Sequence, residues 1–307
     1  MAVAPRPAAT VVLLRDGRDG PEAYLQRRPM HLGFAGGLWV FPGGRVDEAD
    51  RDPAVDASWT GPSPATWAER LGLPLAEARG HVVAACRETL EEAGLLLAEP
   101  APGAKQLADA RRELLAGALG FAELLAGLGV RLDADRLRYW AWWVTPEAET
   151  RRYDTRFFVA GLPADAAVTA HPAEVERERW LPVAAAADDQ SLPMLPPTRY
   201  SLRDLAGFAS VAEALAAGGD RPVERILPVL DGANLVMPWL ERYPVPFPVR
   251  ERGSPPVEAG GSGGLRERSG SPPVEAGGLR ERSGSPSVGS GGSGGVRERS
   301  GSPPVDR

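Results

Sequence analysis

A chain of 307 residues with 43% hydrophobic residues is long enough to bury a core, and its net charge of −6 gives no reason to expect nucleic acid as a partner. Its single cysteine, Cys86, excludes an internal disulfide and suits a reducing compartment. No apolar stretch reaches membrane-spanning length, and the first ten residues lack the regions of a signal peptide, so we expect a cytoplasmic protein without a membrane partner.

The first predicted elements are strands. The apolar runs at 10–14 and 23–26 predict a hairpin, and residues 38–41 predict a third strand. That strand ends at a glycine pair, Gly43 and Gly44, which further acidic residues follow, among them Asp50. The sequence therefore places a tight turn and then carboxylates directly after a buried strand.

A spacer with its own predicted helices follows the glycine pair. Helix-forming residues stand behind Ser-Pro and Leu-Pro starts at 63–72 and 75–80. We therefore expect an insertion at about 51–83 that is folded.

The segment 84–95 is the most informative in the chain. If it is helical, Glu88, Glu91 and Glu92 project from one face, and Arg87 forms an i, i+4 pair with Glu91. Carboxylates on one face repel each other, and Mg²⁺ or Mn²⁺ prefers oxygen ligands of this kind. The segment predicts a divalent-metal site, and the alternative is a solvated acidic helix surface.

The elements after the acidic helix mix strands and helices. Gly94 is expected to end that helix in the left-handed conformation. We then predict strands at 95–97, 137–144, 152–160 and 174–181, a helical stretch at 107–128 broken by Gly117 and Gly120, and a helix at 201–217. This mixture favours an α/β sandwich.

The end of the chain has a different composition. From residue 249 onward, Arg-Glu-Arg units recur at uneven spacing in a background of Gly, Ser and Pro. Such a sequence offers almost no apolar side chains that would offset the entropy of ordering the chain. We therefore expect one domain over 1–248 and a disordered tail over 249–307.

The strand, glycine turn and acidic helix together resemble the Nudix box, G-x5-E-x7-R-E-U-x-E-E-x-G-U, in which U is a bulky apolar residue. Gly44 takes the first position, and residues 87–95 take the second half. Asp50 stands where the family has the first glutamate, and the 36 residues from 51 to 86 form a much longer spacer than the family's. The resemblance implies a Nudix-type α/β/α sandwich with a mixed sheet, and hydrolysis of a nucleoside diphosphate linked to another group.

Further motifs resemble one branch of this family, the coenzyme A and acyl-CoA diphosphatases with an insertion inside the box. The motifs are Leu25-Gln26-Arg27-Arg28, the run from Val40 to Asp47, Thr145-Pro146 with the run from Arg152 to Phe158, and Pro196-Pro197-Thr198. The resemblance spans roughly residues 10–245. It implies a metal-dependent enzyme that cleaves coenzyme A or acyl-CoA to 4′-phosphopantetheine products and adenosine 3′,5′-bisphosphate. The alternatives are a pyrophosphatase acting on ADP-ribose, NADH or a nucleotide sugar, and a non-catalytic nucleotide-sensing module.

The site predictions follow from the acidic helix and from this resemblance. The expected cofactor is Mg²⁺ or Mn²⁺, and its expected ligands are Glu88, Glu91, Glu92 and Asp50, the last with a shorter reach. The expected catalytic residues are Glu88, Glu91 and Arg87, and Arg87 would orient Glu91. Either Glu174 or Glu176 would act as a further metal ligand or as the base. Spacing does not choose between these last two.

Substrate contacts are expected from glycines and arginines. The guanidinium fork matches the geometry of a phosphate, although each arginine has an alternative as a structural ion pair, such as Arg152 with Asp154. The expected substrate-binding residues are Gly43, Gly44, Arg27, Arg28, Arg152 and Arg156. The insertion is expected to help form the acyl-pantetheine or nucleotide pocket.

Overall fold

The computed structural model describes residues 3–32, 35–171, 173–219, 221–239 and 241–244. The chain divides into two units, Met1–Gly253 and Ser254–Arg307. The predicted disordered tail over 249–307 lies outside the described residues. The elements below all belong to the first unit.

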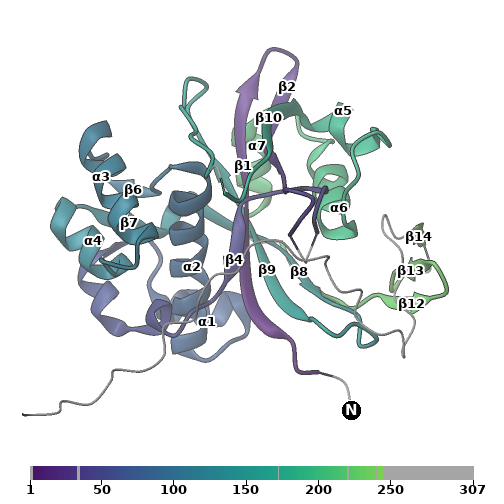
Figure 1. The fold of residues 1–307 in the computed structure, drawn as a ribbon, viewed down its shortest axis with the longest axis horizontal. Coiled ribbons are helices and arrows are strands. Elements are labelled where there is room, and N and C mark those ends of the chain that lie inside the picture. The colour runs from purple at the N-terminus through teal and green to yellow at the C-terminus, as the bar shows by residue number, and fades with distance from the viewer. Residues whose placement is uncertain (1–2, 33–34, 172, 220, 240, 245–307) are drawn as a thin grey trace, which may run out of the picture. The chain divides into compact units, whose positions relative to one another are not determined.

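A mixed sheet forms the centre of this unit (Figure 1). Its strands run in the order β10-β2-β1-β9-β8-β11, with β3 paired to β2 and β4 paired to β1. The pairs β1/β9 and β8/β11 are parallel, and the remaining pairs are antiparallel. The strand bounds are β1 (Arg6–Gly17), β2 (Gly20–Arg27), β3 (Trp39–Val40), β4 (Gly43–Arg45), β8 (Leu137–Val144), β9 (Tyr153–Gly161), β10 (Arg177–Pro182) and β11 (Arg225–Ile226).

Helices cover both faces of the sheet. On one side lie α1 (Pro64–Leu71), α2 (Leu75–Ala93), α3 (Ala104–Leu115) and α4 (Phe121–Leu128), and on the other lie α5 (Val183–Asp188), α6 (Pro196–Leu205) and α7 (Val211–Ala217) (Figure 1). Because side chains alternate along a strand, β1 sends Val11 and Leu13 into the core under α2 and Val12 and Leu14 into the opposite core. The predicted α/β/α sandwich with a mixed sheet is confirmed.

The insertion between the two halves of the box is folded. It contains the short helices η1 (Ala49–Arg51) and η2 (Pro53–Ser58), strand β5 (Trp59–Thr60) and α1. Trp67 of α1 is fully buried, and Arg79 of α2 forms two hydrogen bonds of 2.8 Å with Asp56. Strand β5 also pairs with β7 (Arg131–Asp133), which pairs with β6 (Ala98–Glu99) and leads into η3 (Ala134–Arg136). The insertion therefore packs against the start of α2.

Helix α2 differs from its prediction. It is one helix of 19 residues, whereas the sequence predicted a short helix at 75–80 and a separate acidic one. Residues 81–83 are buried, and this packing stabilises the helical conformation between the two predicted helices. Gly94 ends the helix in the left-handed conformation, with φ of 69°, as predicted.

Other boundaries were wrong for identifiable reasons. Residues 95–97 form no strand, because the chain first pairs at Ala98. The predicted helix 201–217 is two helices, since α6 ends at Leu205 and Ser210 begins a new one by accepting a hydrogen bond from the Glu213 amide. Strands β12 (Val229–Asp231), β13 (Asn234–Val236) and β14 (Arg242–Pro244), which form a small sheet of their own, were not predicted.

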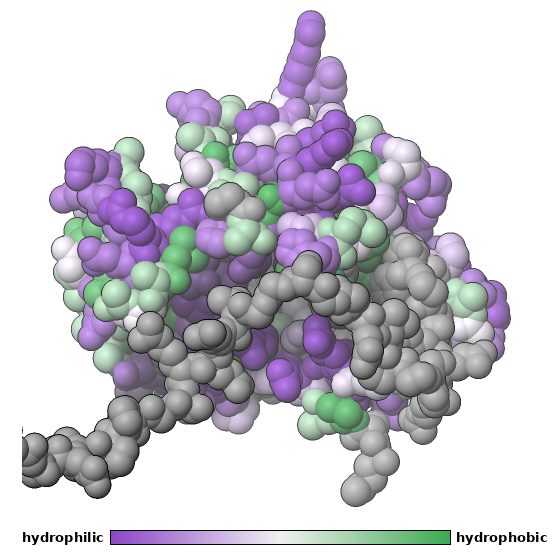
Figure 2. Space-filling model, viewed as in Figure 1, coloured by the Kyte–Doolittle hydropathy of each residue, from purple (hydrophilic) through white to green (hydrophobic). Residues whose placement is uncertain are grey.

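The surface of this unit is mixed in polarity. Figure 2 shows apolar residues scattered among hydrophilic ones on the face in view. Within the described ranges, no helix combines the length and the apolar character needed to cross a bilayer.

Candidate active site

The last turns of α2 hold the predicted acidic residues at the edge of the core. Cys86, Leu90 and Ala93 face inward and are fully buried, which fixes the rotation of the helix. This rotation brings Glu88 and Glu92 toward β4. We call Arg87, Glu88, Glu91 and Glu92 the acidic turn.

Arg87 lies at the centre of this turn. Its guanidinium donates to Glu88 Oε1 at 2.7 Å, to Glu91 Oε2 at 3.3 Å and to the carbonyl oxygen of Arg45 at 2.9 Å. Burial alone would lower the pKa of this group, but the hydrogen bonds with Asp50 and the charges of Glu88, Asp50 and Glu91 raise it. Arg87 thus stays charged and bonds to two of the predicted metal ligands, and its orienting role stays a prediction.

Asp50 pairs with Arg87 across the insertion. Asp50 is 2% exposed, and its two carboxylate oxygens accept from Arg87 Nε at 2.9 Å and from a terminal Arg87 nitrogen at 2.8 Å. The amide of Asp47 donates to the same carboxylate at 2.8 Å. Both oxygens are therefore used within the protein, and this geometry favours a positioning role for Asp50 over ligation of a metal.

Both predicted glycines contact the acidic turn. The Gly43 amide donates to Glu92 Oε2 at 3.0 Å. A Cβ on Gly44 would lie 2.3 Å from Glu88 Oε1, so any side chain there would displace the Glu88 carboxylate from its present position. The two halves of the interrupted box therefore meet in space, despite the long spacer between them.

Burial makes the carboxylates of this turn hard to ionise. It raises the pKa of Glu88 to about 7, although Arg87 opposes the shift. Burial and the charge of Glu88 raise the pKa of Glu92 well above its ordinary value. Burial also raises the pKa of Glu91. A bound cation would favour the ionised forms of all three.

The donor set suits a divalent cation, although the side chains do not enclose one. Within the described ranges, no three Asp, Glu, His or Cys side chains are already arranged as a metal-binding group. Glu88 and Glu91 instead bond to Arg87, which supplies the positive charge. Three crowded carboxylates with raised pKa values fit a hard metal ion by their chemistry.

The structure separates the two alternatives for a further carboxylate. Glu174 is exposed and close enough for its charge to raise the pKa of both Glu91 and Glu92. Glu176 instead lies 3.9 Å from Arg27 as an ion pair, and its amide donates to the Arg27 carbonyl. The predicted strand at 174–181 begins only at Arg177, so Glu174 belongs to the segment that precedes β10. The arrangement favours Glu174.

Arg28 is the predicted arginine whose charge acts on the acidic turn. It lowers the pKa of Glu92, and among the described residues none accepts a hydrogen bond from its buried Nε. Arg27 donates to the Gly37 carbonyl at 3.2 Å and pairs with Glu176. Arg28 therefore has a donor to spare beside the acidic turn.

Arg152 and Arg156 are used inside the fold. Arg156 is 1% exposed, pairs with Asp154 and lies 3.8 Å from the ring centre of Trp142. Arg152 is 7% exposed and donates to the carbonyls of Thr145 and Val3. The ion pair with Asp154 thus belongs to Arg156 and not to Arg152, and the burial of Arg156 does not favour its predicted contact with a phosphate.

Sequence reasoning missed the residues that hold the end of α2. Arg111 of α3 donates to the Glu91 carbonyl at 2.6 and 3.2 Å. The Gln26 side chain and the His171 amide both donate to the Glu92 carbonyl, at 3.2 and 3.1 Å. These bonds satisfy carbonyls that a helix end leaves free. Arginine suits such a position, but nothing in the sequence indicates that α3 packs there.

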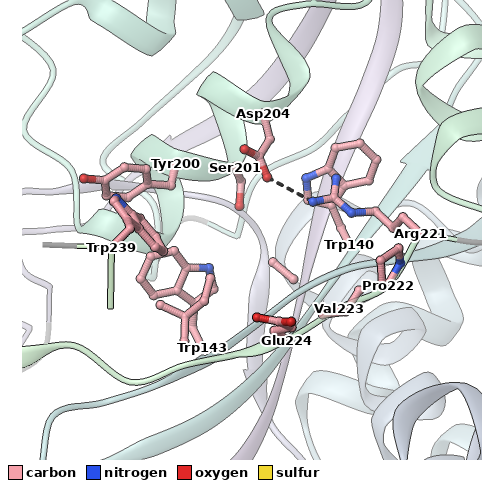
Figure 3. Close-up of a pocket in the computed structure, with 12 residues that line it drawn as sticks. Trp140, Trp143, Tyr200, Ser201, Asp204, Arg221, Pro222, Val223, Glu224 and Trp239 are labelled. Atoms are coloured by element: carbon pink, nitrogen blue, oxygen red, sulfur yellow. Dashed lines mark hydrogen bonds and ion pairs between the residues drawn. The ribbon is translucent and has the colours of Figure 1, made fainter. Parts of the chain in front are cut away.

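A cavity lies on the other side of the sheet, against the core beneath α5, α6 and α7. It has a volume of about 500 Å³ and is lined by Trp140, Trp143 and Tyr200 together with the ion pair of Arg221 and Asp204 at 3.2 Å (Figure 3). None of the predicted site residues lines it. The acidic turn is therefore the candidate active site.

Known proteins resemble this chain over the same region. Residues 6–205 match a family model described as the NUDT19 Nudix domain. A human protein named acyl-coenzyme A diphosphatase NUDT19 is 31% identical over 271 residues, which cover 71% of this chain and 71% of the human protein. The Gallus gallus protein of the same name is 30% identical over 301 residues, covering 78% and 80%. A crystal structure of a Nudix hydrolase from Alicyclobacillus acidocaldarius covers 72% of this chain and 99% of its own, with 26% identity and a TM-score of 0.59.

Proposed function

The chain belongs to the Nudix hydrolase family, and we propose that it cleaves the diphosphate of coenzyme A or acyl-CoA with Mg²⁺ or Mn²⁺ as cofactor. Water adds to one phosphorus, the bond from that phosphorus to the bridging oxygen breaks, and the bridging oxygen leaves with the other phosphate. The products are 4′-phosphopantetheine, or its acylated form, and adenosine 3′,5′-bisphosphate.

The contact between the acidic turn and the glycine pair carries this proposal. Glu92 bonds to the Gly43 amide, and Glu88 lies against Gly44, so the two halves of the box form one site. The helical carboxylates are all retained, which favours an enzyme over a non-catalytic sensing module.

The chain's own residues supply positioning, charge and a base. A metal held by Glu88, Glu91 and Glu92 would neutralise phosphate oxygens and acidify the attacking water. Arg87 orients Glu88 and Glu91, and Asp50 in turn holds Arg87. Arg28 Nε, which has no acceptor among the described residues, suits a phosphate oxygen.

Glu174 is our candidate for the general base. Its amide donates to the His171 carbonyl, and the His171 amide donates to the Glu92 carbonyl, so Glu174 lies near the end of α2 with its carboxylate exposed to solvent. An exposed carboxylate is able to exchange a proton with water. Replacing Glu174 with Gln should lower turnover, whereas Glu176→Gln serves as the matched control because Glu176 pairs with Arg27.

The names of the human and Gallus gallus relatives support the substrate assignment. A direct test incubates the full chain with Mg²⁺ or Mn²⁺ and a panel of coenzyme A, acyl-CoA, ADP-ribose, NADH and a nucleotide sugar. Chromatography should detect adenosine 3′,5′-bisphosphate from the first two. Cleavage of ADP-ribose or NADH while coenzyme A stays intact would overturn the substrate, and binding of a nucleotide without any turnover would favour a sensing module.

A further inference from the structure

An arginine-lined cavity of about 360 Å³ lies where β1 and β9 begin. Four arginines line it, together with Thr150 and Tyr153, and no carboxylate is among its described lining residues. We call this cavity the basic pocket, and its arginines are Arg6, Arg45, Arg151 and Arg152.

Hydrogen bonds of the backbone and of Arg152 fix the walls of the basic pocket. Arg6 pairs with Tyr153 in the β1/β9 ladder, and its amide donates to the Arg152 carbonyl at 2.9 Å. The buried Arg152 guanidinium ties Val3 to Thr145, with bonds of 2.7 and 3.0 Å. The segment before β1 and the loop before β9 are thus fastened together by a buried arginine.

The positive charges of the remaining arginines of the pocket are not balanced by nearby carboxylates among the described residues. Arg6, Arg45 and Arg151 are exposed, and none forms an ion pair with a carboxylate in the described part of the chain. Arginines that line one cavity without a balancing carboxylate favour an anion there, and guanidinium groups match the oxygens of a phosphate. The pocket therefore fits a compact anion of high charge.

The basic pocket begins next to the active site. Arg45 directly follows Gly44, which lies against Glu88, and the Arg45 carbonyl accepts from Arg87 at 2.9 Å. An anion in the pocket would thus lie close to a diphosphate at the acidic turn. In coenzyme A, the ribose that carries the diphosphate also carries a phosphomonoester, whose charge at neutral pH is about −1.5 to −2.

We propose that the basic pocket binds the 3′-phosphate of coenzyme A and so selects coenzyme A over nucleotides that lack this group. The proposal rests on the proposed function and adds the residues that recognise the nucleotide end of the substrate. Arg45 and Arg151 supply the side-chain contacts, and Arg152 holds the walls in place.

The test compares kcat/KM for coenzyme A and for 3′-dephospho-coenzyme A, using the full chain with Mg²⁺. The native protein should prefer coenzyme A by about ten- to a hundredfold, the effect of one or two charge-assisted hydrogen bonds. Arg45→Gln and Arg151→Gln should each move the ratio of the two constants toward one, and Arg151→Lys should retain part of the preference. Arg18→Gln, an exposed arginine on the turn between β1 and β2, is the matched control and should leave the ratio unchanged.

A binding measurement separates this proposal from the proposed function. Calorimetry should show adenosine 3′,5′-bisphosphate binding more tightly than adenosine 5′-monophosphate, with the difference lost in Arg151→Gln. Equal kcat/KM for the two coenzymes in the native protein, or an equal loss for both in the variants, would overturn the 3′-phosphate site while leaving the hydrolase assignment intact. If neither coenzyme is cleaved, the proposed function fails, and equal binding of the two nucleotides then overturns the pocket as well.

Discussion

The acidic turn, which contacts Gly44, and the basic pocket, which includes the next residue, Arg45, carry opposite charges. At the acidic turn, Glu88, Glu91 and Asp50 pair with one guanidinium, that of Arg87, while Glu92 accepts from the Gly43 amide. Four arginines line the basic pocket, and no carboxylate is among its described lining residues. Burial also differs, because Arg87 and Glu92 are buried whereas Arg45 and Arg151 are exposed.

The proposed substrate would account for both regions. A surplus of carboxylates suits a cation, and a surplus of guanidinium groups suits a phosphate. A metal-bound diphosphate with a further phosphate on its ribose supplies both charges. Changes that remove one charge at a time should therefore affect catalysis, stability or specificity in separable ways.

The largest expected effect is on catalysis at the acidic turn. Glu91→Gln and Glu92→Gln each remove a carboxylate that we assign to the metal, which supplies several kcal/mol of transition-state stabilisation. Turnover should fall by on the order of a thousandfold. Glu113→Gln, on an exposed position of α3, is the control. Retained activity in both active-site variants, measured at saturating Mg²⁺, would refute the ligand assignment.

Arg87 should matter for stability as well as for activity. Replacing it with Met leaves the buried Asp50 carboxylate without its partner, and breaking such a pair costs about 3–5 kcal/mol. Urea unfolding measures this loss of unfolding free energy. In a double-mutant cycle, Asp50→Asn should cost less after Arg87→Met than it does alone, whereas additive effects would show that the pair is not coupled.

A pH dependence should distinguish the acidic turn from the rest of the fold. Because the folded pKa of Glu88 is raised to about 7, its stabilising contribution is full below the unfolded pKa and is lost as pH rises through about 7. We expect the free energy of unfolding, measured in metal-free buffer, to fall between pH 5 and pH 8. The native protein should lose up to about 3 kcal/mol more than the Glu88→Gln variant. The same loss in both proteins would place the titrating group elsewhere.

Local pattern predicted much of this site, and tertiary packing decided the remainder. The spacing of Glu88, Glu91 and Glu92 requires only a helix, and Gly94 ended that helix as expected. The pairing of Asp50 with Arg87 depends on how the insertion folds back, which no local pattern encodes. For the same reason, spacing left Glu174 and Glu176 undecided.

The arginines show the limit of sequence reasoning most clearly. Arg152 and Arg156 alternate with apolar residues as an exposed strand face would, yet both are buried by neighbours from other elements. Of the arginines that line the basic pocket, the sequence pointed only to Arg152, because the four come from β1, β4 and the loop before β9. Only the β1/β4 and β1/β9 ladders bring them together.

The smallest expected effect comes from Arg152, which separates construction of the basic pocket from recognition of the phosphate. Replacing Arg152 with Met removes its hydrogen bonds to Thr145 and Val3 and leaves carbonyls unsatisfied, at a cost of about 1–3 kcal/mol. The thermal unfolding temperature should therefore fall for Arg152→Met. It should stay unchanged for Arg151→Gln, because the Arg151 side chain is exposed. Equal stability of the two variants would show that Arg152 does not hold the walls of the pocket, whatever either change does to the preference for coenzyme A.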